Sequence, residues 1–245
     1  MESWKIKELE EAVLKSHGIS YADKIHEPLQ SFHLKSMMAF YHAEEYQKNL
    51  NEMLKASGET GKANIDANAT LMAIFQALSN EKKGDKVILA KFKAEANLIA
   101  SAQAIHSLFD IIASIVYLAL KLDSYPNPLL ENKINLYSVN KFLKKNPICL
   151  KTLGAIKNII SSPEFDYLAA YVNTTKHRSL VSSSLSASFV ENKSGILLKG
   201  FTYVDYKGNL KHYNKKWSQD FILVDFQKLR SVLFCLGDTL NSYLK

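Results

Sequence analysis

Hydrophobic residues recur at helical spacing through most of the chain. In the first such segment, residues 2–17, the apolar positions are Trp4, Ile6, Leu9, Val13 and Leu14, and a glycine follows. This pattern predicts an amphipathic helix that ends at Gly18. The same periodicity predicts further helices over residues 22–56, 63–78, 86–122, 138–145, 149–160, 163–181 and 226–244. Residues 80–85 (NEKKGD) are predicted to form a charged turn, and residues 123–136 a loop.

The pattern changes after Val181, where alternation of period two replaces the helical period. Residues 186–192, 196–205 and 210–217 are predicted to be strands, joined by turns that contain glycine. Residues 221–224 are a candidate extension of this sheet. Asp225 is predicted to cap the last helix.

These elements predict a mainly α fold, a helical bundle with a small antiparallel β-meander inserted before the C-terminal helix. Strands and helices are segregated along the chain, which excludes an α/β winding. We expect a single domain over residues 1–245, with residues 1–80 as an N-terminal helical extension and residues 185–224 as a β-meander appendage.

Composition adds few constraints. The chain has 245 residues, is 47% hydrophobic and carries a formal net charge of +7. The positive charge favours an acidic partner such as nucleic acid, but its Lys-rich, Arg-poor character is equally explained by codon bias in an AT-rich genome. The two cysteines, Cys149 and Cys235, lack metal-ligand spacing and are predicted to be reduced, buried thiols. The longest apolar run, residues 111–120, is too short to span a bilayer, so we expect a cytoplasmic protein without a membrane partner.

The densest polar cluster in an apolar setting lies at the end of the helix predicted over residues 163–181. Ser162 as N-cap and Pro163 at the first position give this helix a well-formed start. Asn173 and His177 are one turn apart on one face, and Lys176 and Arg178 flank the histidine. We define Asn173, Lys176, His177 and Arg178 as the α7 cluster.

A second polar set lies on the long helix predicted over residues 86–122. Glu95, His106 and Asp110 share one face of an otherwise apolar helix. A charge in such a setting needs a partner, and the α7 cluster is the expected supplier. Two interpretations remain open, buried ion pairs that fix helix register and a functional cleft. A metal site made of His106, Asp110, His177 and Glu95 is disfavoured because no His-x-x-x-His or comparable pair lies within one helix.

Other chemistries lack their signatures or have a simpler explanation. No Gly-x-Ser-x-Gly motif is present for a serine hydrolase, and the GETGK segment at residues 58–62 lacks the spacing of a phosphate-binding loop. The strands carry basic and aromatic residues that resemble a stacking platform for single-stranded nucleic acid. A lysine-protected sheet edge is the favoured explanation of this set. Its members are Lys199, Lys207, Lys211, His212, Lys215, Lys216, Tyr203, Tyr206, Tyr213 and Trp217.

Two segments together resemble the HEPN superfamily of all-helical domains. They are FKAEANLIASAQAIHSLFDIIASIVY on the long helix and YLAAYVNTTKHRSLV on the later one. The N-x-x-K-H-R ending, followed by strands and a closing helix, is similar to a bacterial HEPN-like branch. Many members of the superfamily are RNases of toxin–antitoxin and phage-defence systems. Their motif is an Arg, usually followed by a polar residue, with a His four to six residues after the Arg.

The resemblance implies a metal-independent endoribonuclease or an RNA-acting toxin or defence protein, with no cofactor. Asn173 and His177 take the catalytic positions, but Val172 stands where the motif Arg is expected. Lys176 or Arg178 would then bind the RNA phosphate, and Glu95, His106 and Asp110 would support the site. RNA, an antitoxin or other protein partner, and a homodimer are the implied partners.

Two alternatives remain open beside this interpretation. The missing Arg favours a catalytically inactive HEPN-like module that binds RNA, a nucleotide or a protein partner. An unrelated helical scaffold would explain the bundle but not the α7 cluster.

Overall fold

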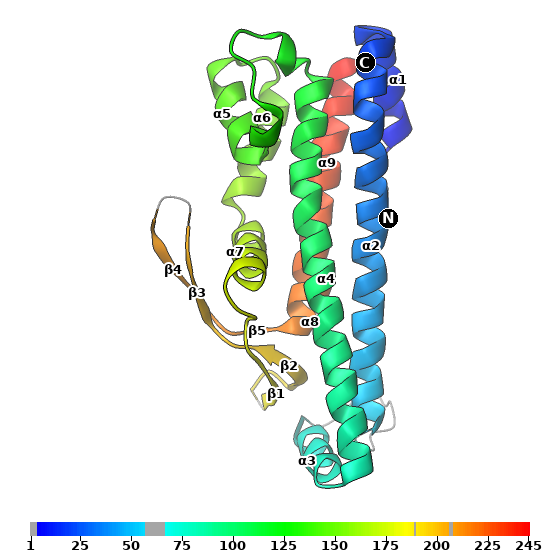
Figure 1. Ribbon diagram of the computed structural model, residues 1–245, viewed down its shortest axis with the longest axis vertical. Coiled ribbons are helices and arrows are strands. Elements are labelled where there is room, and N and C mark those ends of the chain that lie inside the picture. The colour runs from blue at the N-terminus through cyan, green and yellow to red at the C-terminus, as the bar shows by residue number, and fades with distance from the viewer. Residues whose placement is uncertain (1–3, 57–66, 189, 206–207) are drawn as a thin grey trace. The chain divides into compact units, whose positions relative to one another are not determined.

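The computed structural model describes residues 4–56, 67–188, 190–205 and 208–245 (Figure 1). The chain divides into two compact units, and each is described by itself. Unit 1 comprises Met1–Met38, Ala104–Ala169 and Phe226–Lys245, and unit 2 comprises Ala39–Gln103 and Ala170–Asp225. The expectation of one domain over residues 1–245 stays a prediction.

The described chain is mainly α-helical, which confirms the predicted fold class. Its α-helices are α1 (Ile6–His17), α2 (Ile19–Ala56), α3 (Ala67–Leu78), α4 (Glu81–Ala119), α5 (Leu136–Lys145), α6 (Leu150–Ser161), α7 (Pro163–His177), α8 (Ser218–Asp220) and α9 (Phe226–Leu244). Short 3₁₀ turns lie at Leu122–Ser124 and Glu131–Lys133. Most predicted boundaries differ from these by a few residues, and those of α9 agree.

Side-chain caps explain where several helices begin. Phe165 N–H donates to Ser162 Oγ at 3.2 Å, so Ser162 caps α7 as predicted. Asn135 caps α5, three residues before the predicted start, and forms a reciprocal capping box with Ser138. The prediction of a turn at residues 80–85 is wrong. Asn80 Oδ1 accepts the backbone N–H three residues later, and α4 begins directly after it.

In unit 1, Trp4 is the residue that joins the start of the chain to α9. Its indole N–H donates to Asn241 Oδ1 at 3.4 Å, and Asn241 Nδ2 donates to the Lys5 carbonyl at 3.0 Å. The Trp4 ring also packs edge to face on Phe32, with centroids 5.1 Å apart. Gly237 of α9 makes this approach feasible, because a Cβ there would lie 2.2 Å from the indole.

In unit 2, a buried hydroxyl pair joins α2 to the start of α8. Tyr46 is 0% exposed and its hydroxyl lies 2.7 Å from Ser218 Oγ. Ser218 Oγ in turn donates to the Ile196 carbonyl at 2.8 Å, so Tyr46 is the donor to Ser218. Burial raises the pKa of Tyr46 well above its usual value, which keeps the hydroxyl neutral. The three residues therefore satisfy one another inside the core of this unit.

The strands of unit 2 form two ladders. β2 (Lys193–Leu198) pairs antiparallel with β1 (Ser183–Ser188) and with β5 (Lys216–Trp217), and β3 (Phe201–Val204) pairs antiparallel with β4 (Leu210–Tyr213). The pairs Leu198 with Lys216 and Phe201 with Tyr213 continue one register. The predicted strands over residues 196–205 and 210–217 are therefore partners, interrupted at Gly200. A Cβ at Gly200 would lie 3.0 Å from the Tyr213 carbonyl.

Three details of the predicted meander are wrong. The first strand is the serine-rich segment 183–188 rather than residues 186–192. Gly195 lies within β2, and the turn before this strand instead uses Asn192 in the left-handed region at φ 47°. Residues Phe221–Asp225 form a π-helix rather than a strand, and they lead directly into α9.

Helix α4 is long and apolar enough to cross a membrane by length and composition alone. An 18-residue window within it has a mean hydropathy of 1.5. However, 56% of that window is buried inside the structure, which is also typical of the core helix of a soluble protein. The expectation of a cytoplasmic protein stays a prediction.

We predict that Gly237→Ala destabilises the protein by about 1–3 kcal/mol, because the new methyl group must displace Trp4. Urea unfolding followed by far-UV circular dichroism measures this change. Gly154→Ala in α6 is the matched control. A Cβ at Gly154 meets nothing within 4 Å, so this helical substitution should raise stability by about 0.5–1 kcal/mol. Equal effects of the two substitutions would contradict the role given to Trp4.

Candidate functional site

The α7 cluster lies at the C-terminal end of α7, on the side that the fold leaves accessible. Asn173 is half-buried, and Lys176, His177 and Arg178 are exposed. The helix ends here because the backbone N–H groups of Arg178 and Ser179 both donate to one carbonyl, that of residue 174, at 3.0 and 3.1 Å. The predicted helix is therefore shorter at this end, and the cluster stands at its terminus.

Three members of the cluster have no side-chain partner within the part of the chain that the structure describes. The side chains of Asn173, Lys176 and His177 form no hydrogen bond or ion pair there. A histidine that fixed the fold would be buried and hydrogen-bonded. The exposure of His177 thus favours a surface function over a structural one.

Val172 is buried, although it lies one turn before the exposed Lys176 on the same face of α7. It is 0% exposed, and its neighbours Tyr171 and Thr174 are 2% and 5% exposed. An Arg at position 172 would have to bury its charge in the core of unit 2, at a large cost in free energy. The position where the resemblance expects the motif Arg cannot present a cation to a ligand in this structure.

Arg178 is held by the hairpin of β3 and β4. Its Cζ lies 5.3 Å from the centroid of the Tyr203 ring, within the range of a cation–π interaction. Tyr203 is half-buried on β3 and lies opposite Lys211 of β4. The sequence did not predict this contact, since residues 178 and 203 belong to different elements.

Aromatic contacts hold the β3–β4 hairpin against α7. Phe201 stacks on Tyr213 across the hairpin, with centroids 5.0 Å apart and ring planes 15° apart. Phe201 also meets Tyr171 of α7 edge to face at 6.4 Å. Tyr171 makes a second such contact with Phe221, at 5.2 Å. The hairpin that carries Tyr203 is therefore anchored to the buried side of α7.

Glu95 has a different partner from the one predicted. Its Oε1 lies 2.5 Å from Lys91 Nζ, one turn earlier on α4, and the same oxygen accepts the Ser183 hydroxyl. Lys91 Nζ also lies 3.1 Å from Ser183 Oγ. The predicted pairing of Glu95 with the α7 cluster is wrong, because an i, i+4 lysine supplies the charge. Glu95 instead fixes the start of β1, the strand that follows the cluster.

The other two supporting residues belong to unit 1, so their predicted pairing with the α7 cluster of unit 2 stays a prediction. His106 is half-buried and Asp110 is exposed. Because Asp110 is exposed, its carboxylate stays in contact with water and does not carry the desolvation cost of a buried charge.

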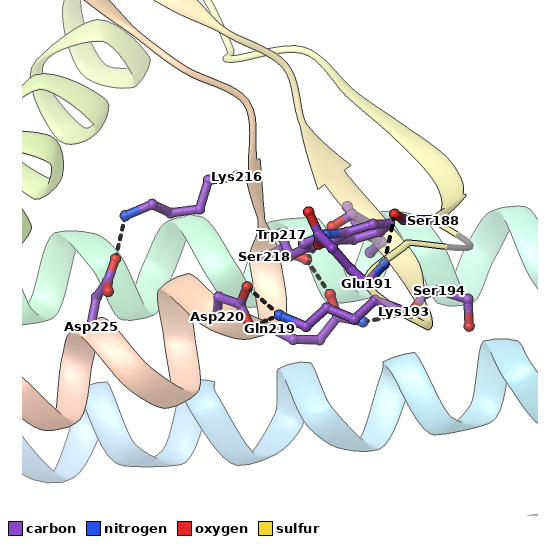
Figure 2. A network of polar contacts seen from close by, with 11 residues as sticks. Ser188, Glu191, Lys193, Ser194, Lys216, Trp217, Ser218, Gln219, Asp220 and Asp225 are labelled. Atoms are coloured by element: carbon purple, nitrogen blue, oxygen red, sulfur yellow. Dashed lines mark hydrogen bonds and ion pairs between the residues drawn. The ribbon is translucent and has the colours of Figure 1, made fainter. Parts of the chain in front are cut away.

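Part of the predicted basic face of the strands is structural (Figure 2). Lys216 lies 2.5 Å from Asp225, and Trp217 is buried and donates its indole N–H to Glu191. Figure 2 shows Lys216 extended toward Asp225. Asp225 was predicted to cap the last helix, but its carboxylate instead forms an ion pair with Lys216. Tyr206 and Lys207 lie outside the described residues. Of the remaining members, Lys199, His212 and Lys215 are exposed and Lys211 is half-buried.

A groove of about 580 Å³ lies on α9 of unit 1, with Lys151 of α6 at its side. It contains Arg230, the second arginine of the chain, and Cys235. Cys149 is buried as predicted, but Cys235 is exposed, which corrects the expectation for that thiol. None of the predicted site residues lines this groove. In the described parts of both units, no group of three or more His, Cys, Asp or Glu side chains could hold a metal ion.

A comparison of the chain with protein-family models, with curated proteins and with solved structures finds no match in any of the three. The resemblance to the HEPN superfamily therefore remains a hypothesis drawn from the two helical segments. What the α7 cluster does has to be inferred from its own residues.

We predict that Val172→Arg destabilises the protein by about 3 kcal/mol or more, because it buries an unpaired charge. Thermal unfolding by calorimetry measures this loss. Lys176→Arg, one turn later at the exposed end of α7, is the control and should leave the melting temperature unchanged. A folded Val172→Arg protein of unchanged stability would show that position 172 can reach solvent.

Proposed function

We propose that this protein acts on RNA as a metal-independent endoribonuclease of HEPN type, with the α7 cluster as its site. The observation that supports the proposal is the exposed, unpartnered His177 at the end of a helix that is otherwise largely buried. Asn173 lies one turn before it on the same face, and two cations flank it. This combination offers a proton acceptor, a polar orienting group and positive charge within one surface.

In the proposed reaction, the His177 imidazole takes the proton from a ribose 2′-hydroxyl. Histidine is the side chain most often used for proton transfer at neutral pH. The 2′ oxygen then bonds to the adjacent phosphorus, and the bond from phosphorus to the 5′ oxygen breaks. The departing 5′ oxygen takes a proton from water or from the protonated imidazole. The RNA product carries a 2′,3′-cyclic phosphate on one fragment and a 5′-hydroxyl on the other.

The remaining roles follow from charge and position. Asn173 orients His177 or donates to the phosphate through its amide. Lys176 or Arg178 stabilises the charge that develops on the phosphate oxygens. Glu95 supports the site indirectly, because it holds Ser183, six residues after His177, at the start of β1. For His106 and Asp110 a supporting role rests on the resemblance alone.

A second function is favoured by the burial of Val172. Without the motif Arg, the same surface would serve a catalytically inactive module that binds RNA, a nucleotide or a protein partner such as an antitoxin. A homodimer in the cytoplasm, with both clusters facing one cleft, is implied by the resemblance in either case. The two functions share the α7 cluster and differ in whether His177 transfers a proton.

Incubation of the purified protein with total RNA and with tRNA in EDTA separates the two functions. We expect wild-type protein to cleave RNA, and His177→Ala to lose about 10²–10⁴-fold of the rate. Because His177 is exposed, the variant should keep the wild-type melting temperature. His212→Ala, an exposed histidine of β4, is the matched control and should retain the rate.

Absence of cleavage by the wild type would reject the enzyme and leave the binding module. Cleavage that survives in His177→Ala would reject this site.

A further inference from the structure

The two cations beside His177 differ in what the fold does with them. Arg178 lies over the Tyr203 ring, whereas Lys176 has no hydrogen-bond or ion-pair partner among the described residues. Both side chains are exposed. The structure thus orients one cation and leaves the other free to move.

The support beneath Arg178 is an ordered aromatic assembly. Neighbouring side chains of a strand point to opposite faces, so Tyr203 and Thr202 lie on opposite faces of the hairpin. Thr202 is exposed. On the Tyr203 side, Phe201 stacks on Tyr213 and contacts Tyr171 of α7. A side chain that rests on such a base loses little further conformational entropy when it binds a ligand.

An arginine in this position has a binding capacity that a lysine lacks. The guanidinium is planar, so one face can lie on an aromatic ring while the opposite face stays available for stacking. Unstacked nucleobases are commonly held on aromatic rings or on guanidinium planes in RNA-binding proteins. The Lys176 ammonium is a point charge on a flexible stem, which suits a phosphate but not a base.

We infer that Arg178, positioned by Tyr203 of the β3–β4 hairpin, stacks on an unpaired RNA base while Lys176 binds the neighbouring phosphate. The inference rests on the proposed action of the α7 cluster on RNA. It assigns separate roles to two cations that are otherwise equivalent candidates for the phosphate. It also defines the substrate class, because a base inside a duplex is already stacked on both faces and is not available to Arg178.

The inference is tested by binding, with His177→Ala as the background so that no RNA is cleaved. The probes are a fluorescently labelled 12-nucleotide single-stranded RNA and the same strand in a duplex, both in EDTA. Fluorescence anisotropy at several salt concentrations gives the dissociation constant and its salt dependence. Arg178→Lys keeps the charge and removes the plane, and Tyr203→Leu removes the ring.

We expect Arg178→Lys and Tyr203→Leu each to weaken single-strand binding by roughly 5- to 100-fold, with duplex binding and the salt slope unchanged. Tyr203→Phe, which keeps the ring, should restore the binding that Tyr203→Leu loses. Lys176→Gln should instead lower the slope of log K against log salt by about 0.7 and weaken binding to all sequences alike. Thr202→Ala, on the opposite face of the hairpin, is the control and should bind as the parent does.

The outcomes separate this inference from the proposed function. Normal single-strand binding by Arg178→Lys overturns the inference, even if wild-type protein cleaves RNA through His177. A wild type that binds in the expected pattern but cleaves nothing supports the inference and rejects the enzyme. Failure to bind either probe overturns the inference, and a protein partner for the α7 cluster would then be favoured.

Discussion

The packing of α7 within unit 2 determines which of its residues are accessible, and the candidate site follows from this constraint. Tyr171 is almost fully buried and contacts Phe201 and Phe221, while Val172 on another side of the helix is fully buried. A helix held on several sides by large apolar contacts has little freedom to rotate, since rotation would expose apolar surface at about 25 cal/mol per Å². In the last two turns of α7, residues 170–177, the accessible side chains are those of Asn173, Thr175, Lys176 and His177. Chemistry at this end of the helix is therefore confined to these residues and to those that follow them.

This packing also decides where a cation can stand. A charge at position 172 would be buried without a partner. The free-energy cost of that burial is far larger than the stabilisation that a surface ion pair provides. One turn later the chain has left the core, and Lys176 and Arg178 keep their charges in water. Within α7 and the residue that follows it, only Lys176 and Arg178 can supply positive charge beside His177. The departure from the HEPN pattern at Val172 is thus a consequence of which face of α7 the core requires.

The sequence predicted the local elements better than the contacts between them. The Ser162 cap and the bounds of α9 depend on neighbours in the chain and on period, and these predictions agree with the structure. The strands of the β3–β4 hairpin also lie within the segments predicted for them. The predicted partner of Glu95, the α7 cluster, was wrong. Lys91 lies one turn away on the same helix, and this spacing favours it over a cluster that is distant in the sequence. The Tyr203–Arg178 contact was missed because it joins separate elements. Periodicity carries no information on which ring lies beneath which cation.

The difference between Lys176 and Arg178 shows how tertiary structure gives distinct chemistry to residues that a sequence treats alike. Both are cations within two positions of one another, and each is exposed. The hairpin reaches only Arg178, and an aromatic ring stabilises a guanidinium through its face, where base stacking also occurs. Lys176 is exposed and has no hydrogen bond or ion pair among the described residues, and a phosphate contact does not require an oriented side chain because Coulomb attraction is not directional. A β-hairpin placed after α7 can therefore change what the helix binds without altering a residue of the helix itself.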